Sequence, residues 1–215
     1  MKFNLARDAI KYLIKKYSIK EIYIPYYLCD VVRHAIFEVG AKPLYYHIDD
    51  NFMPEVELKK DAYILYPNYF GICDKNVEIL AKKYPNLIVD NAHAYYATSR
   101  GFATIYAKHK FFPVEFGAEL CLEKDKKNTP ADYSRRKKYE DYAKIFANRN
   151  LLKIEIENDC IPFCYPFLAP TIEEADKVAK ELQQKGLIIY RYWNPIPESF
   201  NEYKFYSRLV PIPLS

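Results

Sequence analysis

The sequence contains 215 residues, half of them hydrophobic, which is enough chain for one domain with a small appendage and a substantial core. Its five cysteines are odd in number and include no CxxC pair, which argues against a disulfide framework or a zinc site and favours a reducing, cytosolic location. Residues 1–17 carry charges throughout, and no later apolar run approaches the roughly 20 residues of a membrane span, so we expect neither a signal peptide nor a transmembrane helix.

The first elements alternate between helical and strand patterns. Residues 4–17 place apolar side chains at helical spacing, with Asn4 as the expected N-cap. Residues 21–25 form a β-prone run that ends at a proline. Helical spacing returns over residues 29–40 and ends at Gly40.

The alternation continues through the middle of the chain. Strand patterns occur at residues 43–48, 62–67, 87–90, 102–107 and 118–123. A helix is predicted over residues 74–85, with Asp74 at its N-cap. Because strands separated by helices favour right-handed βαβ crossovers, we predict an α/β fold with a mostly parallel sheet and helices on both faces.

After a long predicted helix at residues 131–148, the composition of the chain changes. The final part predicts a strand at 161–168, a helix at 171–186 capped by Thr171, and a strand at 187–193.

These last elements form a small lobe of α+β type. We therefore expect two domains, a large α/β domain at residues 1–149 and a small C-terminal lobe at residues 150–215.

A basic stretch at residues 124–139 carries much of the excess behind the formal net charge of +4. Such a stretch is typical of a solvated helix face, and it could also attract phosphates or nucleic acid. The 22 tyrosines are scattered along the chain and do not form the spaced stacking motif of an RNA-binding sheet. Nucleic-acid binding is therefore disfavoured.

The stretch LIVDNAHAYY, residues 87–96, delivers a carboxylate and an imidazole to the end of an apolar strand, at Asp90 and His93. In open α/β sheets ligands bind beyond the carboxyl ends of the strands, so these side chains are candidates for a site. The sequence has neither GxGxxG nor GxxxxGKS, which argues against the usual dinucleotide and nucleoside-triphosphate sites. Both residues could instead cap the following turn.

Lys110 follows the next predicted strand and directly precedes an aromatic and proline turn, in YAKHKFFPVEF. Partial desolvation there would favour the neutral amine, which is the form that attacks an aldehyde. A solvated lysine is the alternative, and Lys108 is a neighbouring competitor.

The order of these motifs resembles the large domain of the DegT/DnrJ family of pyridoxal-phosphate-dependent sugar aminotransferases, which have fold type I. The segments that carry the resemblance are IPYYLCDVVRHAIFEVGAKPLYYHID, YILYPNYFGI, VDNAHAYYA and YAKHKFFPVEFGAEL. The later segments RRKKYEDYAKIF, IPFCYPFL and GLIIYRYWNPIP are similar to the entry into that family's small domain.

The resemblance implies pyridoxal 5'-phosphate (PLP) as cofactor and a role for several residues. Asp90 would face the pyridine nitrogen, Ala92 would lie under the ring, and His93 would lie near the ring's phenolic oxygen. Lys110 would bind the cofactor covalently and shuttle a proton. Arg7 would lie close to the phosphate and Tyr27 would pack against the cofactor, although ordinary core packing is the alternative for Tyr27.

The chain also departs from the family pattern. It is shorter than usual members, EKDKKNTPADYSRR replaces a loop that reaches into the partner subunit, the Gly-Thr phosphate loop is absent, and Ala107 replaces a serine. The resemblance implies a homodimer that transfers an amino group, from glutamate, to a nucleotide-linked keto sugar in polysaccharide biosynthesis. The departures favour an alternative, a non-catalytic member that acts as a scaffold or sugar-binding partner.

Overall fold

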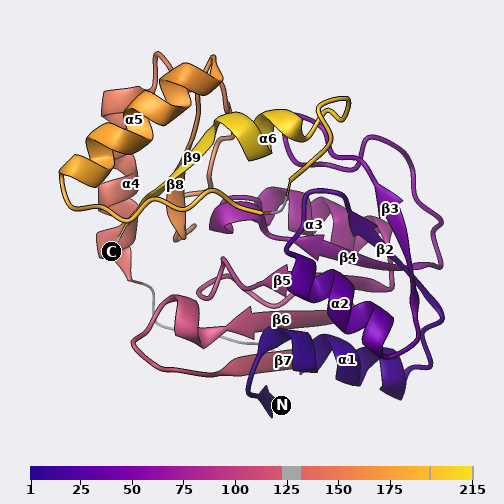
Figure 1. Cartoon of the computed structure of the whole chain (residues 1–215). Coiled ribbons are helices and arrows are strands. Elements are labelled where there is room, and N and C mark those ends of the chain that lie inside the picture. Colours follow the sequence, from indigo (N-terminus) through magenta and orange to yellow (C-terminus); the bar gives the residue numbers. More distant parts are fainter. Residues whose placement is uncertain (123–131, 194, 215) are drawn as a thin grey trace.

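A computed structural model describes residues 1–122, 132–193 and 195–214 and has two sheets of unequal size (Figure 1). The larger sheet has seven strands in the order β1-β7-β6-β5-β4-β2-β3. Its strands are β1 (Lys2–Phe3), β2 (Glu21–Pro25), β3 (Lys42–Tyr46), β4 (Tyr63–Pro67), β5 (Leu87–Asn91), β6 (Ala103–Ala107) and β7 (Ala118–Leu122). Strands β3, β2, β4, β5 and β6 run parallel, and β7 is antiparallel to both β6 and β1.

Helices cover both faces of this sheet, as the sequence predicts. Helices α1 (Ala6–Lys16) and α2 (Asp30–Glu38) pack with one face, and α3 (Asp74–Lys83) packs with the other. The alternation along β5 shows why, because Ile88 joins the core under α1 and α2 whereas Leu87 and Val89 join the core under α3. The predicted α/β class is confirmed.

Two helix starts differ from the prediction by one residue. Helix α1 is preceded by Leu5 and not by Asn4, and the Leu5 N–H donates to the Asp8 carboxylate at 3.2 Å. Helix α3 includes Asp74 as its first residue, and Cys73 precedes it. In both cases a side chain outside the expected position accepts a hydrogen bond from an N–H group at the start of the helix. For α3, Asn68 Oδ1 accepts from Cys73 N at 2.9 Å.

The smaller sheet pairs β8 (Cys164–Leu168) with β9 (Leu209–Pro213), antiparallel. This pairing corrects the prediction of a strand at residues 187–193, which have no strand structure. The apolar side chains of that segment do not enter a ladder, because β9 from the C-terminal end of the chain pairs with β8 instead.

Sequence reasoning did not predict β9 as a strand because it contains prolines, and proline cannot donate a hydrogen bond to a ladder. In the observed register Pro166 lies opposite Pro211 and Cys164 lies opposite Pro213. These pairs alternate with Tyr165–Ile212 and Phe167–Val210. All the prolines therefore lie in alternate pairs of the ladder, where no N–H donor is needed.

Helices α4 (Tyr133–Phe146) and α5 (Ile172–Gln184) pack against the smaller sheet and share a core with it. Thr171 caps α5 as predicted, since its hydroxyl accepts from Glu174 N at 3.2 Å. Helix α6 (Tyr203–Arg208) leads into β9. The division at residues 149 and 150 stays a prediction, and α4, on its N-terminal side, contributes Phe146 to the core of the smaller sheet.

The five cysteines all lie in the described part of the chain, and no disulfide joins them. Within the described ranges, the helices are too short or too polar to cross a membrane. Half of the basic stretch, residues 124–131, lies outside the described residues, and residues 132–139 lead into and form the first half of α4.

Candidate active site

The structure brings Asp90, Ala92, His93 and Lys110 to one cavity beyond the carboxyl ends of β5 and β6. Lys110 ends a short 3₁₀ helix, η2 (Lys108–Lys110), that follows β6 directly. Strands β5 and β6 are neighbours in the parallel part of the sheet, so their carboxyl ends meet at the same edge. The cavity has a volume of about 30 Å³, and the remaining residues that line it are Leu28, Cys29, Pro67, Asn68 and Trp193.

Asp90 is the acidic side chain of this cavity. Its carboxylate accepts a hydrogen bond from the N–H of Ala92 at 2.9 Å, which turns the chain across the cavity. Burial raises the pKa of Asp90, and the opposing effects of the Lys110 charge and the Ala92 N–H are smaller. A buried carboxylate in this position would be stabilised by a cationic group of a ligand.

His93 is 4% exposed and lies beside Lys110, with 2.9 Å between Nε2 and Nζ. Burial lowers the pKa of His93 well below its usual range, and the Lys110 charge acts in the same direction. The imidazole is therefore neutral at physiological pH, and Nε2 accepts a hydrogen bond from the Lys110 amine.

Lys110 is half-buried, and burial lowers its pKa, while the charge of Asp90 raises it to a smaller extent. This is the environment that the aromatic and proline turn predicted. The Lys110 amine thus has a larger neutral fraction than an exposed lysine has at the same pH. Lys108, the neighbouring competitor, is exposed and does not line the cavity.

Aromatic rings enclose the imidazole of His93. The Phe163 ring stacks on it with centroids 4.4 Å apart and planes at 9°, and the Trp193 ring is also near parallel to it at 5.8 Å. Trp193 lines the cavity as well. Sequence reasoning missed both residues, since each comes from a segment far along the chain that reaches the site only through tertiary packing.

Gly71, in the 3₁₀ turn η1 (Tyr69–Gly71) after β4, allows the close approach of this turn to His93. Its φ is +67°, and a Cβ there would lie 2.2 Å from the carbonyl oxygen of His93. The preceding Phe70 also has a positive φ, of 55°, and its carbonyl accepts from Phe163 N at 2.9 Å. The turn therefore joins the site to the segment that carries Phe163.

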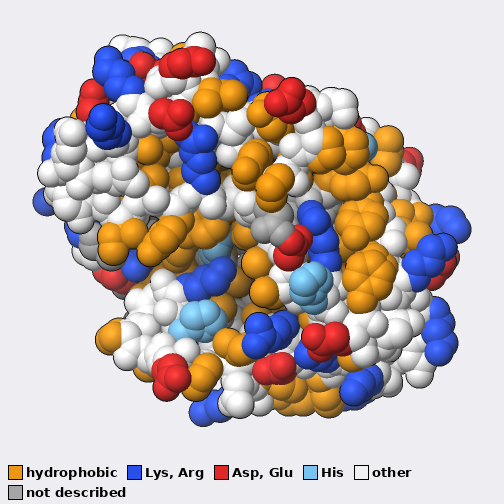
Figure 2. All heavy atoms as spheres, viewed as in Figure 1, with side chains coloured by type: hydrophobic (Ala, Val, Ile, Leu, Met, Phe, Trp, Pro, Cys, Tyr) orange, Lys and Arg blue, Asp and Glu red, His pale blue; other side chains and the backbone are white. Residues whose placement is uncertain are grey.

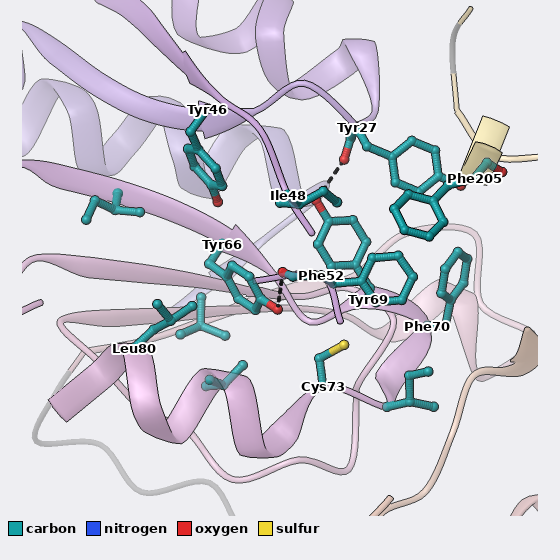
Figure 3. Close-up of a cluster of buried hydrophobic side chains, with 14 of the residues drawn as sticks. Tyr27, Tyr46, Ile48, Phe52, Tyr66, Tyr69, Phe70, Cys73, Leu80 and Phe205 are labelled. Atoms are coloured by element: carbon teal, nitrogen blue, oxygen red, sulfur yellow. Dashed lines mark hydrogen bonds between the residues drawn. The ribbon is translucent and has the colours of Figure 1, made fainter. Parts of the chain in front are cut away.

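Two of the predicted site residues lie away from the cavity. Arg7 is exposed on α1, where its charge acts on Glu38. Tyr27 is fully buried in the core on the α3 face, where its ring is parallel to that of Tyr69 at 5.9 Å and its carbonyl accepts from the Tyr69 hydroxyl at 2.9 Å (Figure 3). The Tyr27 hydroxyl donates to the Tyr192 carbonyl at 2.8 Å. Tyr27 reaches the site indirectly, through an edge contact with Trp193 at 4.6 Å.

Comparison with solved structures identifies the architecture as that of sugar aminotransferases. Spr1654 from Streptococcus pneumoniae, provisionally described as a sugar aminotransferase and solved in its PMP form, superposes with a TM-score of 0.75 at 17% identity, over 100% of this chain and 80% of that one. PseC from Helicobacter pylori, an aminotransferase involved in the biosynthesis of pseudoaminic acid, gives 0.73 at 16% identity, over 99% and 80%.

A DegT DnrJ EryC1 StrS aminotransferase from Brucella abortus gives a TM-score of 0.72 at 14% identity, over 99% of this chain and 80% of that one. No model of a known protein family matches the sequence, and no curated protein matches it. The resemblance to the DegT/DnrJ type is thus borne out by the fold, which the chain shares over its whole length.

Proposed function

We propose that the protein is a PLP-dependent aminotransferase that moves an amino group, from glutamate, to a nucleotide-linked keto sugar. One observation carries the proposal: Asp90, His93 and Lys110 converge on one cavity at the carboxyl edge of a sheet with the fold of sugar aminotransferases. The resemblance and the relatives solved with PLP or PMP support the choice of cofactor.

The residues at the ring end of the cavity fit the cofactor. Asp90 offers a buried negative charge to a ring nitrogen, Ala92 is small enough to lie under a ring, and Lys110 offers an amine with a lowered pKa. Bound PLP supplies a ring that withdraws electrons from the substrate carbon.

The protein's own part in the reaction follows from the environment of Lys110. Its amine would take the proton from the α-carbon of the amino donor and would supply the proton that the carbon of the keto sugar gains, and His93 Nε2, 2.9 Å away, holds that amine in place. The rings of Phe163 and Trp193 exclude water from the same space.

The volume of the cavity and the residues at the start of α2 fit PLP and its phosphate less well. A volume of about 30 Å³ holds one or two water molecules, so side chains in the cavity wall must move to admit a pyridine ring. Leu28 and Cys29 at the start of α2 line the cavity, but Asp30 in the first turn of that helix opposes an anion. These two observations favour the second candidate, a non-catalytic protein that keeps the fold as a scaffold or sugar-binding partner.

The experiment that separates the two candidates is a spectrum of the purified protein with added PLP. We expect a visible absorption band that disappears on addition of glutamate, with release of 2-oxoglutarate. The Lys110→Ala variant should lack both changes, and the Lys108→Ala variant, altered at an exposed neighbour, should keep them. Wild-type protein that stays colourless with excess PLP would exclude the enzyme and leave the scaffold.

A further inference from the structure

A larger cleft, of about 430 Å³, lies beside the Asp90 cavity and shares Lys110 with it. It runs between Lys110 at the edge of the main sheet and the smaller sheet, which contributes Cys164, Pro211 and Pro213. Its volume lies within the range of small-molecule sites. Figure 2 shows hydrophobic and basic side chains meeting along the boundary between the two parts of the molecule.

The charged side chains of the cleft are both cationic. Lys110 lies at one end and Arg135, from the first turn of α4, lines the wall, and the lining within the described residues includes no carboxylate. A cleft of this kind attracts an anion.

Arg135 is held in position by a backbone carbonyl and an aromatic ring. It is 8% exposed, its Nη1 donates to the Phe163 carbonyl at 3.2 Å, and its guanidinium lies 5.0 Å from the centre of the Phe111 ring. Its Nε also pairs with Asp132, whose carboxylate oxygen lies 3.9 Å away, beyond hydrogen-bond distance. A planar guanidinium with donors to spare is the group that binds phosphate or carboxylate oxygens in pairs.

The rim of the cleft is apolar and exposed. Ile188 and Tyr190 line it and are each 65% exposed, in the segment that sequence analysis had predicted to be a strand. Tyr192, from the same segment, lines the cleft further in. Exposed apolar side chains beside a cationic wall suit a ligand that has a ring as well as an anionic group.

We propose that Arg135 binds the phosphate of a phosphorylated sugar in this cleft, while Tyr190 packs against the apolar face of the sugar ring. The proposal rests on the proposed function, because it places the substrate against the Lys110 amine. An oxyanion could also come from the carboxylate of the amino donor, but glutamate has no ring to cover Ile188 and Tyr190.

Calorimetric titration of the full chain without PLP tests this assignment. The probes are glucose 1-phosphate, glucose and L-glutamate. We expect glucose 1-phosphate to bind at least about tenfold more tightly than glucose, and Arg135→Ala to remove that difference. Arg135→Lys should keep part of it, and Lys137→Ala, which removes an exposed charge from the same helix, should keep all of it.

Tyr190→Ala provides a variant at an exposed position that should fold normally and weaken glucose 1-phosphate binding about threefold or more. Equal binding of glucose and glucose 1-phosphate would overturn the proposal, and so would an Arg135→Ala loss confined to glutamate. The titration contains no cofactor, so its result is independent of the test for PLP. Arg135-dependent binding in a protein that never turns yellow with PLP would support the proposed ligand site and contradict only the proposed enzyme activity.

Discussion

Asp90 is the residue on which the proposed chemistry depends most. A neutral isostere in its place removes the negative partner of a ring nitrogen without changing the volume of the side chain. We predict that Asp90→Asn lowers the rate of amino transfer by about 10²-fold or more, as the loss of a preorganised charge does in other enzymes. Steady-state assay of 2-oxoglutarate release measures this, and an unchanged rate would remove Asp90 from the site.

Lys110 gives a prediction about pH. Burial lowers its pKa from the ordinary lysine value of 10.5, so the neutral amine forms at lower pH than in a free lysine. The rate of PLP capture, trapped with borohydride, should therefore rise with pH and level off earlier than the capture by Nα-acetyllysine. The Asp90 charge raises the pKa of Lys110, so Asp90→Asn should move the inflection to lower pH. A move to higher pH would contradict the electrostatic account.

Glu202, directly before α6, anchors the C-terminal part of the chain to the main sheet. It is fully buried, and its carboxylate accepts from Ile48 N at 2.8 Å and contacts His47 Nδ1 at 3.0 Å. Glu202→Ala leaves the buried N–H of Ile48 without an acceptor and removes the contact with His47, so we expect a loss of about 2–3 kcal/mol in the free energy of unfolding, measured in urea. Glu198→Ala, an exposed carboxylate four residues earlier, should change it by less than about 0.5 kcal/mol.

The elements that sequence reasoning predicted well are those whose partners are close along the chain. Leu87, Ile88 and Val89 alternate between the two faces of the sheet. This pattern lies within the strand itself, so β5 could be predicted from the local sequence. The strand lies at β9 and not at residues 187–193, because β9 pairs with β8 across 41 to 49 residues and its prolines mask the strand signal.

The site divides in the same way. The convergence of Asp90, His93 and Lys110 was predictable because each lies at or just beyond the carboxyl end of a strand, at one edge of the sheet. Phe163, Trp193 and the close approach of Gly71 to His93 were not, because they arise when distant segments dock. Ala92, Arg7 and Tyr27 came from the resemblance alone. Ala92 lines the cavity, whereas Arg7 lies on an exposed helix face and Tyr27 lies in the core.

At the scale of the whole molecule, the C-terminal segment closes the site that the main sheet builds. Trp193 is the chain's only tryptophan and lines the cavity beside Asp90 and Lys110. We predict that binding of PLP displaces the indole and changes its fluorescence with the same concentration dependence as the visible absorption band.

Trp193→Ala should take up PLP faster than the wild type, because a smaller side chain in the cavity wall leaves more room for the ring. The variant should also lose about 3 kcal/mol of stability, since it removes a large aromatic side chain from contact with Tyr27 and His93. PLP binding that leaves the fluorescence of the wild type unchanged would show that the cofactor enters elsewhere.

The measurement that bears most directly on the central claim is peptide mass mapping after borohydride reduction of the protein with PLP. The account predicts one dominant pyridoxyl adduct, on Lys110, that is lost when excess glutamate is added before reduction. A label spread over exposed lysines such as Lys108, or a dominant adduct at any other residue, would contradict it.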